Sequence, residues 1–163
     1  MIKKPITQEN ALQRAADLCS RSEQCRQEIR EKLNRWGLGS NDAEKIIARL
    51  VNERYIDDRR FARAYAADKF RFSGWGKRKI ALMLRIKRIE ADFIAEALGR
   101  IDEDEYAGSA LKLLKSRCHG QIPESREESV RLIRFGMQRG FEADILFKAL
   151  SRLRRQQEDN ETD

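Results

Sequence analysis

Two adjacent carboxylates, Asp57 and Asp58, have the residue type and spacing of a site for a divalent cation. A metal-dependent nuclease uses such carboxylates, and the four acids at residues 102–105 could add to the set. A structural role explains the same residues, because side-chain oxygens cap helix N-termini and negative charge is favoured there. We therefore expect Asp57 or Asp58 to cap a helix, and we predict no catalytic residue.

The three cysteines, Cys19, Cys25 and Cys118, together with the single histidine, His119, are the side chains from which a zinc site could be built. Their irregular spacing lacks the close pairs of structural zinc sites. Free cysteines that pack as small apolar residues explain them better. We predict no metal, no cofactor and no nucleophilic catalysis, and the odd number of cysteines favours a reducing compartment.

The segment from Gly74 to Lys79 has some features of a phosphate-binding loop. Such a loop requires Gly-x-x-x-x-Gly-Lys followed by Ser or Thr. Here Arg78 follows Lys77, and Arg71 stands where the first glycine would be. Nucleotide hydrolysis is therefore not predicted.

The stretch from residue 69 to residue 88 is basic and contains no Asp or Glu. Its cations are Lys69, Arg71, Lys77, Arg78, Lys79, Arg85, Lys87 and Arg88. Clustering of one sign is typical of a surface that meets a polyanion or an acidic protein. The alternative is a solvated helix face that is balanced by acids from elsewhere. No base-reading pair is evident, so any binding to single- or double-stranded DNA would be independent of its sequence.

Trp75 lies within this stretch, between Gly74 and Gly76. Its ring could stack on a base or enter a pocket of a partner. It could equally fill a gap between helices where the two glycines allow the backbone to approach. Both interpretations stay open, and we include Trp75 with the eight cations in the predicted partner-binding surface.

The composition predicts an almost entirely α-helical protein. The 163 residues include only two prolines and nine glycines, and residues that lose little freedom in a helix are abundant. Start and stop signals predict nine helices. They cover approximately residues 7–19, 20–36, 41–51, 57–72, 77–87, 92–101, 102–117, 123–140 and 142–154.

Capping residues set several of these predicted starts. We expect Thr7 to cap the first helix, Ser20 or Ser22 the second, and Asn41 with Glu44 to form a capping box at the third. We expect Pro123 to lie in the first turn of the eighth helix. The fifth helix, residues 77–87, is apolar on more than one face, so we expect it to lie between two layers.

An internal repeat accounts for nine helices in sets of three. Residues 89–98 align without a gap to residues 141–150, and Phe61-Ala62 matches Tyr106-Ala107. We predict three-helix repeats at 1–56, 57–101 and 102–155, followed by an acidic disordered tail at 156–163. Each repeat is small, so neighbours should pack into an elongated, curved array.

The net charge of +7 lies mainly in the predicted middle repeat. Residues 57–101 hold twelve Lys and Arg against six Asp and Glu, whereas residues 102–163 are net acidic. No apolar run approaches the roughly 20 residues that cross a bilayer, and the first ten residues lack the apolar segment of a signal peptide. We expect a monomeric, soluble cytoplasmic protein without a membrane partner.

Three segments together resemble the RecX family of bacterial recombination regulators. They are Tyr55-Ile56-Asp57-Asp58-Arg59-Arg60-Phe61-Ala62, then Gly74-Trp75-Gly76 with the basic helix to Ile89, and Arg139-Gly140-Phe141. The resemblance covers nearly the whole chain. The chain departs from the family pattern at four positions: Arg54 and Arg88 replace glycines, Lys77 replaces a proline, and Gly136 replaces a leucine.

The resemblance implies a function in DNA repair and the SOS response. It implies a non-enzymatic protein that lies in the groove of the RecA filament and restrains its ATPase, strand-exchange and co-protease activities. Some members of the family also bind DNA. The alternative hypothesis is a helical-repeat module that binds nucleic acid independently of RecA, and a nuclease is the third.

Overall fold

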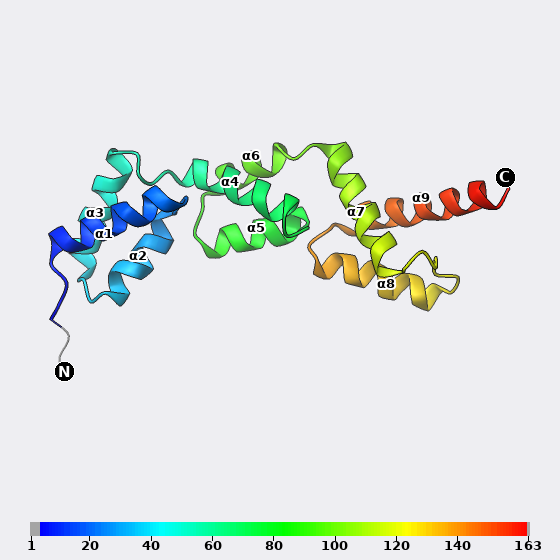
Figure 1. The fold of residues 1–163 in the computed structure, drawn as a ribbon, viewed down its shortest axis with the longest axis horizontal. Coiled ribbons are helices and arrows are strands. Elements are labelled where there is room, and N and C mark those ends of the chain that lie inside the picture. The colour runs from blue at the N-terminus through cyan, green and yellow to red at the C-terminus, as the bar shows by residue number, and fades with distance from the viewer. Residues whose placement is uncertain (1–3, 163) are drawn as a thin grey trace. The chain divides into compact units, whose positions relative to one another are not determined.

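The computed structural model describes residues 4–162, and over that range it contains nine α-helices and no β-strand (Figure 1). This confirms the predicted all-α class. The helices are α1 (Gln8–Arg21), α2 (Arg26–Arg35), α3 (Ser40–Asn52), α4 (Asp58–Arg71), α5 (Lys77–Ile86), α6 (Ala91–Gly99), α7 (Glu103–Arg117), α8 (Arg126–Gln138) and α9 (Ala143–Glu161).

The chain divides into two compact units, each built from two segments. The first comprises Met1–Ala64 with Leu84–Ala95, and the second comprises Tyr65–Met83 with Glu96–Asp163. The predicted middle repeat, residues 57–101, therefore contributes to both units. None of the helices described is long and apolar enough to cross a bilayer.

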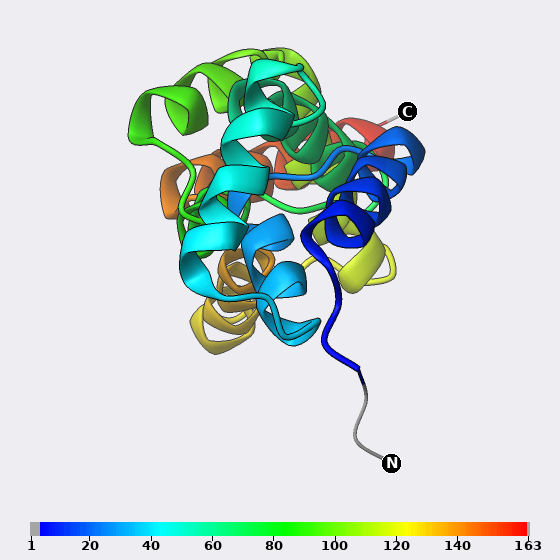
Figure 2. The same ribbon diagram turned by 90° about the vertical axis from the view of Figure 1, so that its left-hand side faces the viewer.

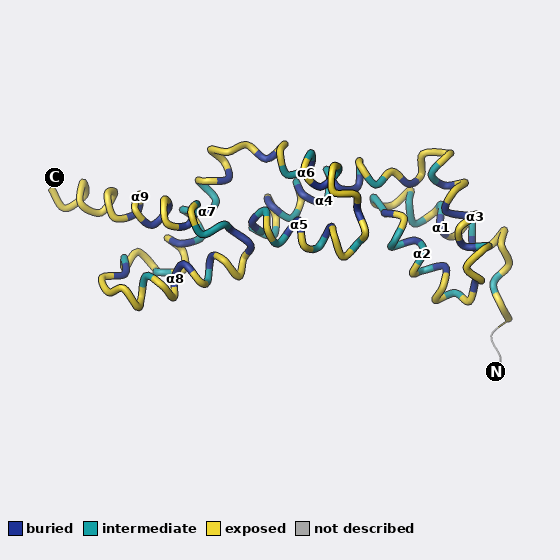
Figure 3. The backbone as a smooth tube through the Cα atoms, turned by 180° about the vertical axis from the view of Figure 1, so that it is seen from behind, coloured by how far each residue is buried: buried dark blue, intermediate teal, exposed yellow. Residues whose placement is uncertain are grey.

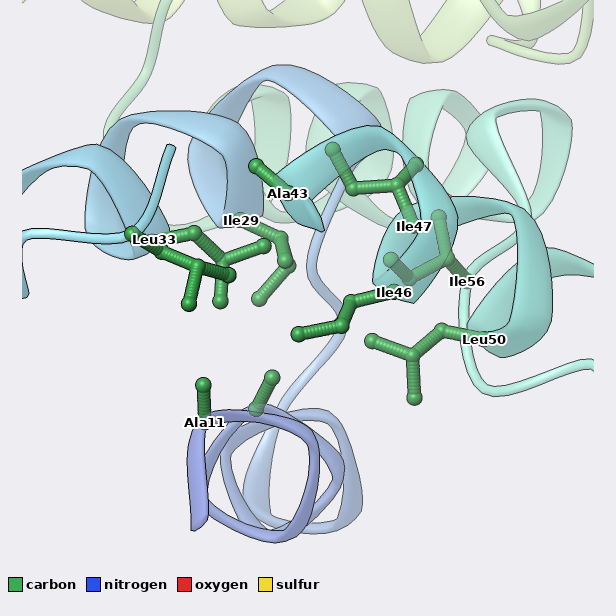
Figure 4. Close-up of a cluster of buried hydrophobic side chains, with 10 residues drawn as sticks. Ala11, Ile29, Leu33, Ala43, Ile46, Ile47, Leu50 and Ile56 are labelled. Carbon is green, nitrogen blue, oxygen red and sulfur yellow. The ribbon is translucent and has the colours of Figure 1, made fainter. Parts of the chain in front are cut away.

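Helices α1, α2 and α3 can be followed in Figure 2, and the core of the first unit lies among them (Figure 4). Apolar residues at helical spacing predict that α3 buries Ala43, Ile46, Ile47, Leu50 and Val51. The first four are at most 6% exposed, and Val51 is partly buried against the same cluster. Ile29 and Leu33 of α2 and Ala11 of α1 point into the same cluster. The one-face spacing in the sequence thus predicted this core correctly.

The core of the second unit forms where α9 packs against α7 and α8. Tyr106 and Leu114 of α7, Ile133 of α8 and Leu146 of α9 are all buried there. Gly136 belongs to this core because a β-carbon at that position would lie 2.4 Å from the Leu146 side chain. Leu146 thus occupies the space that a leucine at position 136 would need.

The second helix of each predicted repeat ends with the same geometry. A residue in the left-handed conformation is followed by a buried apolar residue, whose amide donates to the carbonyl five positions earlier. The left-handed residues are Gly37, Arg88 and Gly140, with φ of 87°, 57° and 96°. The buried residues that follow them are Leu38, Ile89 and Phe141. This shared ending supports the internal repeat.

Two capping predictions were wrong. Helix α2 begins at Arg26 rather than after Ser20 or Ser22, and Cys25 at its N-cap makes no side-chain capping bond. The predicted box of Asn41 and Glu44 does not form, because α3 begins at Ser40 after Gly39.

Glu44 has a different partner from the predicted one, and side-chain caps are found on other helices. The Glu44 carboxylate pairs with Arg30 of α2 at 2.5 Å. A capping box is formed by Ser125 and Glu128 at the start of α8, so Pro123 precedes this helix and the prediction that it lies in the first turn was wrong. Thr7 does cap α1, as predicted.

Two further expectations about helix environment and extent were wrong. Leu82 and Ile86 of α5 are 51% and 62% exposed, so this helix is not covered on both faces. Helix α9 continues to Glu161, past the predicted end near Arg154, with exposed side chains on its last turns (Figure 3). Residues 156–161 are therefore helical rather than disordered.

Candidate polyanion-binding surface

Trp75 is the centre of a cluster that also contains Tyr65, Lys69 and Lys79. The ammonium nitrogens of Lys69 and Lys79 lie 4.8 and 4.4 Å from the centroid of the indole ring. Tyr65 contacts the same ring edge-on at 6.5 Å. Cations are attracted to the face of an aromatic ring, so the half-buried Trp75 holds two positive charges beside it. We call these four residues the tryptophan cluster.

The first turn of α5 is tied to α7 and α9 through Tyr106. The Lys77 amide donates to the Tyr106 hydroxyl at 2.9 Å, and the Lys77 ammonium lies 4.7 Å from the centre of that ring. The hydroxyl in turn donates to the Glu142 carboxylate at 2.6 Å. Burial and the bond to Glu142 raise the pKa of Tyr106, so its hydroxyl stays protonated at neutral pH.

Gly76 and Gly140 bring two distant backbone segments into direct contact. The Gly76 amide donates to the Arg139 carbonyl at 2.8 Å, and the Arg78 amide donates to the Gly140 carbonyl at 3.0 Å. The amides of residues 76, 77 and 78 all have partners within the chain. The start of α5 therefore offers no backbone cradle to a phosphate, and any anion must be bound by side chains.

The predicted cations differ in how freely they face solvent. Arg71, Arg78, Arg85 and Arg88 are exposed, whereas Lys69, Lys77 and Lys79 are half-buried against aromatic rings. Lys87 is half-buried and forms an ion pair with Glu28 at 2.6 Å.

The two units share these cations. Lys69, Arg71, Trp75, Lys77, Arg78 and Lys79 belong to the second unit, and Arg85, Lys87 and Arg88 belong to the first. The tryptophan cluster lies entirely within the second unit.

Phe72 is an aromatic residue of this surface that the sequence reasoning missed. Its side chain is 85% exposed, although phenylalanine is usually buried. It follows Asp68 by four positions and Lys69 by three, so on a helix it falls on the polar face. An aromatic residue on the polar face of a helix was the sequence signal that could have identified Phe72 as exposed. Phe72 thus adds an exposed apolar ring to the basic stretch of residues 69–88.

The two family-motif aspartates cap two different helices. Asp57 accepts from the amide of Arg60 at 3.0 Å, which caps α4 and confirms a capping role. Asp58 accepts from the amide of Arg26 at 2.9 Å and so caps α2. The motif residue Phe61 is buried behind them.

A metal-binding arrangement is not found around these acids. Within residues 4–162, no three His, Cys, Asp or Glu side chains are grouped so that they could hold a metal ion. The motif glycine Gly74 serves a backbone role, since its φ of 66° lies in the left-handed region.

The chain is similar to RecX proteins over most of its length. The family models for the first and second three-helix domains of RecX match residues 11–50 and 57–98. The regulatory protein RecX of Chromobacterium violaceum is 32% identical over 85% of this chain and 87% of its own length. That of Prosthecochloris aestuarii is 31% identical over 88% of this chain and 93% of its own. The Lactobacillus johnsonii relative is longer, and the match covers 44% of it.

Solved structures of RecX proteins share the fold. A crystal structure of a regulatory protein RecX aligns with a TM-score of 0.75 at 25% identity, over 85% of this chain and 68% of the other. The crystal structure of RecX from Lactobacillus salivarius aligns with a TM-score of 0.77 at 21% identity, over 90% of this chain and 96% of the other.

Proposed function

Because the chain belongs to the RecX family of regulatory proteins, we propose that it regulates the RecA recombinase, the partner that its resemblance to this family implies. It binds the RecA nucleoprotein filament and restrains the ATPase, strand-exchange and co-protease activities. It catalyses no reaction of its own. A regulator of this kind must bind one state of the filament more tightly than another, since equal affinity for both would shift nothing.

The observation that carries this proposal is the tryptophan cluster with its neighbouring free cations. Lys69 and Lys79 are held beside Trp75, while Arg71 and Arg78 extend into solvent on the same unit. No acidic residue interrupts residues 69–88. Such a surface is complementary to a nucleoprotein filament, which presents phosphates and acidic protein groups together.

The test is the ATPase activity of RecA on single-stranded DNA as this protein is added. The wild-type protein should inhibit hydrolysis well below a one-to-one ratio to RecA. A variant with R71E and R78E reverses the two solvent-facing charges without touching the aromatic packing, and it should lose most of the inhibition. The matched control, K45E with R155E, also reverses two exposed charges and should inhibit like the wild type.

Each failure has a separate meaning. If the folded wild-type protein leaves ATP hydrolysis unchanged, the RecA assignment is wrong. If wild type inhibits but R71E/R78E inhibits equally well, the regulator stands and this surface is wrong.

A second candidate function is nucleic-acid binding that is independent of RecA. The exposed ring of Phe72 favours it, because an exposed aromatic ring in a basic segment can stack on an unpaired base. Tight, salt-sensitive DNA binding without any effect on RecA ATPase would select this candidate.

A further inference from the structure

Two arginines lie over the ring of Phe135 in α8: Arg117 from the end of α7, and Arg139 from the end of α8 itself. The guanidinium carbon of Arg117, at the end of α7, lies 4.7 Å from the ring centroid, and that of Arg139 lies 5.3 Å from it. The two carbons are therefore at most about 10 Å apart. Both side chains are exposed. In the described part of the chain, neither guanidinium is paired with a carboxylate.

The segment that contains Arg139 contacts the start of α5, which belongs to the basic surface of residues 69–79. The carbonyl of Arg139 accepts from the Gly76 amide, and the next carbonyl, of Gly140, accepts from the Arg78 amide. A β-carbon on Gly140 would lie 2.4 Å from Cβ of Lys79, so no side chain separates the two segments there. The basic surface of residues 69–79 thus continues onto Arg139 and, across Phe135, to Arg117.

We propose that Arg117 and Arg139 bind neighbouring phosphates of a single-stranded nucleic acid, and so extend the polyanion-binding surface from α5 onto α7 and α8. The inference rests on the proposed polyanion-binding role of residues 69–79. It assigns a binding role to the third predicted repeat, whose net negative charge hides these cations in the sequence.

The chemistry of the pair favours phosphate. A guanidinium offers several donors in one plane, which suits the oxygens of a phosphate. Packing over the Phe135 ring restrains both side chains before a ligand arrives, so less conformational entropy is lost on binding. Even in a duplex, phosphates of one strand follow each other at about 3.4 Å along the helix axis, and a single strand can extend further. Phosphates of one backbone can therefore meet two guanidinium groups that are about 10 Å or less apart.

Two aromatic residues of the basic stretch favour a single strand over a duplex or an acidic protein. Phe72 is 85% exposed, and Trp75 is half-buried between two lysines. Unpaired bases stack on such rings, whereas paired bases and carboxylates do not use them in this way. The cations would then follow the backbone while the rings contact bases, without sequence preference.

The experiment is a fluorescence-anisotropy titration of a fluorescein-labelled oligothymidylate, repeated between about 50 and 200 mM salt. Each phosphate contact with a single strand contributes about −0.7 to the slope of log affinity against log salt. The R117Q/R139Q variant should therefore have a slope less steep by about 1.4, and R117Q alone by about 0.7. R117K/R139K keeps both charges and should keep the slope.

The matched control is R14Q/R21Q, which removes two exposed arginines from α1 in the first unit. Arg14 is also held over an aromatic ring, 4.4 Å from that of Trp36, so the control reproduces the loss of a stacked guanidinium. Its slope should equal that of the wild type. If R117Q and R117Q/R139Q also leave the slope unchanged, the proposal is overturned.

Two other outcomes overturn it for separate reasons. Absence of oligothymidylate binding by the wild type would remove the nucleic-acid ligand while leaving regulation of RecA intact. Tighter binding to a duplex of the same length would contradict the single-strand assignment. Conversely, the predicted slopes together with no effect on RecA ATPase would sustain this inference and refute the RecA proposal.

Discussion

The carboxylate of Asp58 accepts a hydrogen bond from the backbone amide of Arg26, although the two residues are 32 positions apart. Helix α2 begins at Arg26 without a side-chain cap of its own, because Cys25 precedes it. Asp58 supplies that cap from the first turn of α4, while its neighbour Asp57 caps α4 itself. The Asp-Asp pair thus joins two helix starts within the first unit.

Replacement of Asp58 by alanine should lower the free energy of unfolding by about 1–2 kcal/mol, since it removes the only side-chain cap seen on α2. D58N should retain most of the stability, because the amide oxygen still accepts a hydrogen bond. Urea denaturation followed by circular dichroism measures both variants. A D58A midpoint equal to that of the wild type would show that the contact with Arg26 does not stabilise the fold.

Gly76 and Gly74 should differ in their tolerance of alanine, although only one residue separates them. A β-carbon at Gly76 would lie 2.2 Å from the carbonyl carbon of Gly140, so G76A must separate the two segments. At Gly74 a β-carbon meets nothing within 4 Å, and only its φ of 66° opposes alanine. G74A should cost about 1 kcal/mol and G76A at least about 3 kcal/mol. Equal melting temperatures for the two variants would contradict the close contact.

Arg88 should be a position where glycine stabilises the protein. Its φ of 57° matches the left-handed conformation of Gly37 and Gly140 at the ends of the corresponding helices. A residue with a β-carbon pays about 1 kcal/mol or more in this region, which exceeds the entropy that glycine adds to the unfolded chain. R88G should raise the unfolding free energy by about 0.5 kcal/mol, and G37A should lower it by about 1 kcal/mol. A destabilised R88G protein would argue against backbone strain at this position.

Substitutions of two cations in the basic stretch, Lys87 and Arg78, should affect different properties: the first stability, and the second binding. Lys87 pairs with Glu28, and their side chains are only 23% and 25% exposed, so K87Q leaves a largely buried carboxylate without its ion pair. That change should cost about 1–3 kcal/mol. Arg78 is exposed, so R78Q should leave stability within about 0.5 kcal/mol and reduce the inhibition of RecA. Thermal denaturation and the ATPase titration, performed on both variants, distinguish the two roles.

The stability of the protein should decline above about pH 9. Burial raises the pKa of the Cys25 thiol from 9.0 to about 11, and the negative charges of Glu28 and Asp58 oppose its ionisation further. The unfolded chain loses this proton at lower pH than the folded protein does. The free energy of unfolding therefore keeps its full value below pH 9 and falls as the pH rises from 9 towards 11. At about 1.4 kcal/mol per unit, the loss reaches up to about 3 kcal/mol.

Two variants distinguish the contributions of the Cys25 thiol and the Tyr106 hydroxyl to this loss of stability at high pH. C25A should remove the part due to the thiol. Y106F should remove a second part, because the pKa of Tyr106 is also raised, chiefly by burial. Unfolding free energies from pH 7 to 11 provide the measurement. An unchanged decline in C25A would show that Cys25 does not titrate with folding.

The features that the sequence determined depend on residues close together along the chain. Helix α3 buries one face because its apolar residues recur at helical spacing, and Thr7 caps α1 because its hydroxyl reaches an amide only three positions away. Residues 89–98 and 141–150 align without a gap, and each segment follows a left-handed residue into the start of a helix. Local geometry alone fixes these features.

The tertiary structure decided the features in which distant segments meet. The Asp58 cap on α2, the contact between Gly76 and Gly140, and the placement of Arg117 over Phe135 each join residues that are not neighbours along one helix. Charge counted along the sequence assigned the basic surface to residues 69–88 alone, because the acids at 102–105 mask the arginines of the third repeat. A helical pattern fixes which face is buried, but it does not fix which residues of another segment that face meets, since this depends on packing between segments rather than on spacing within one.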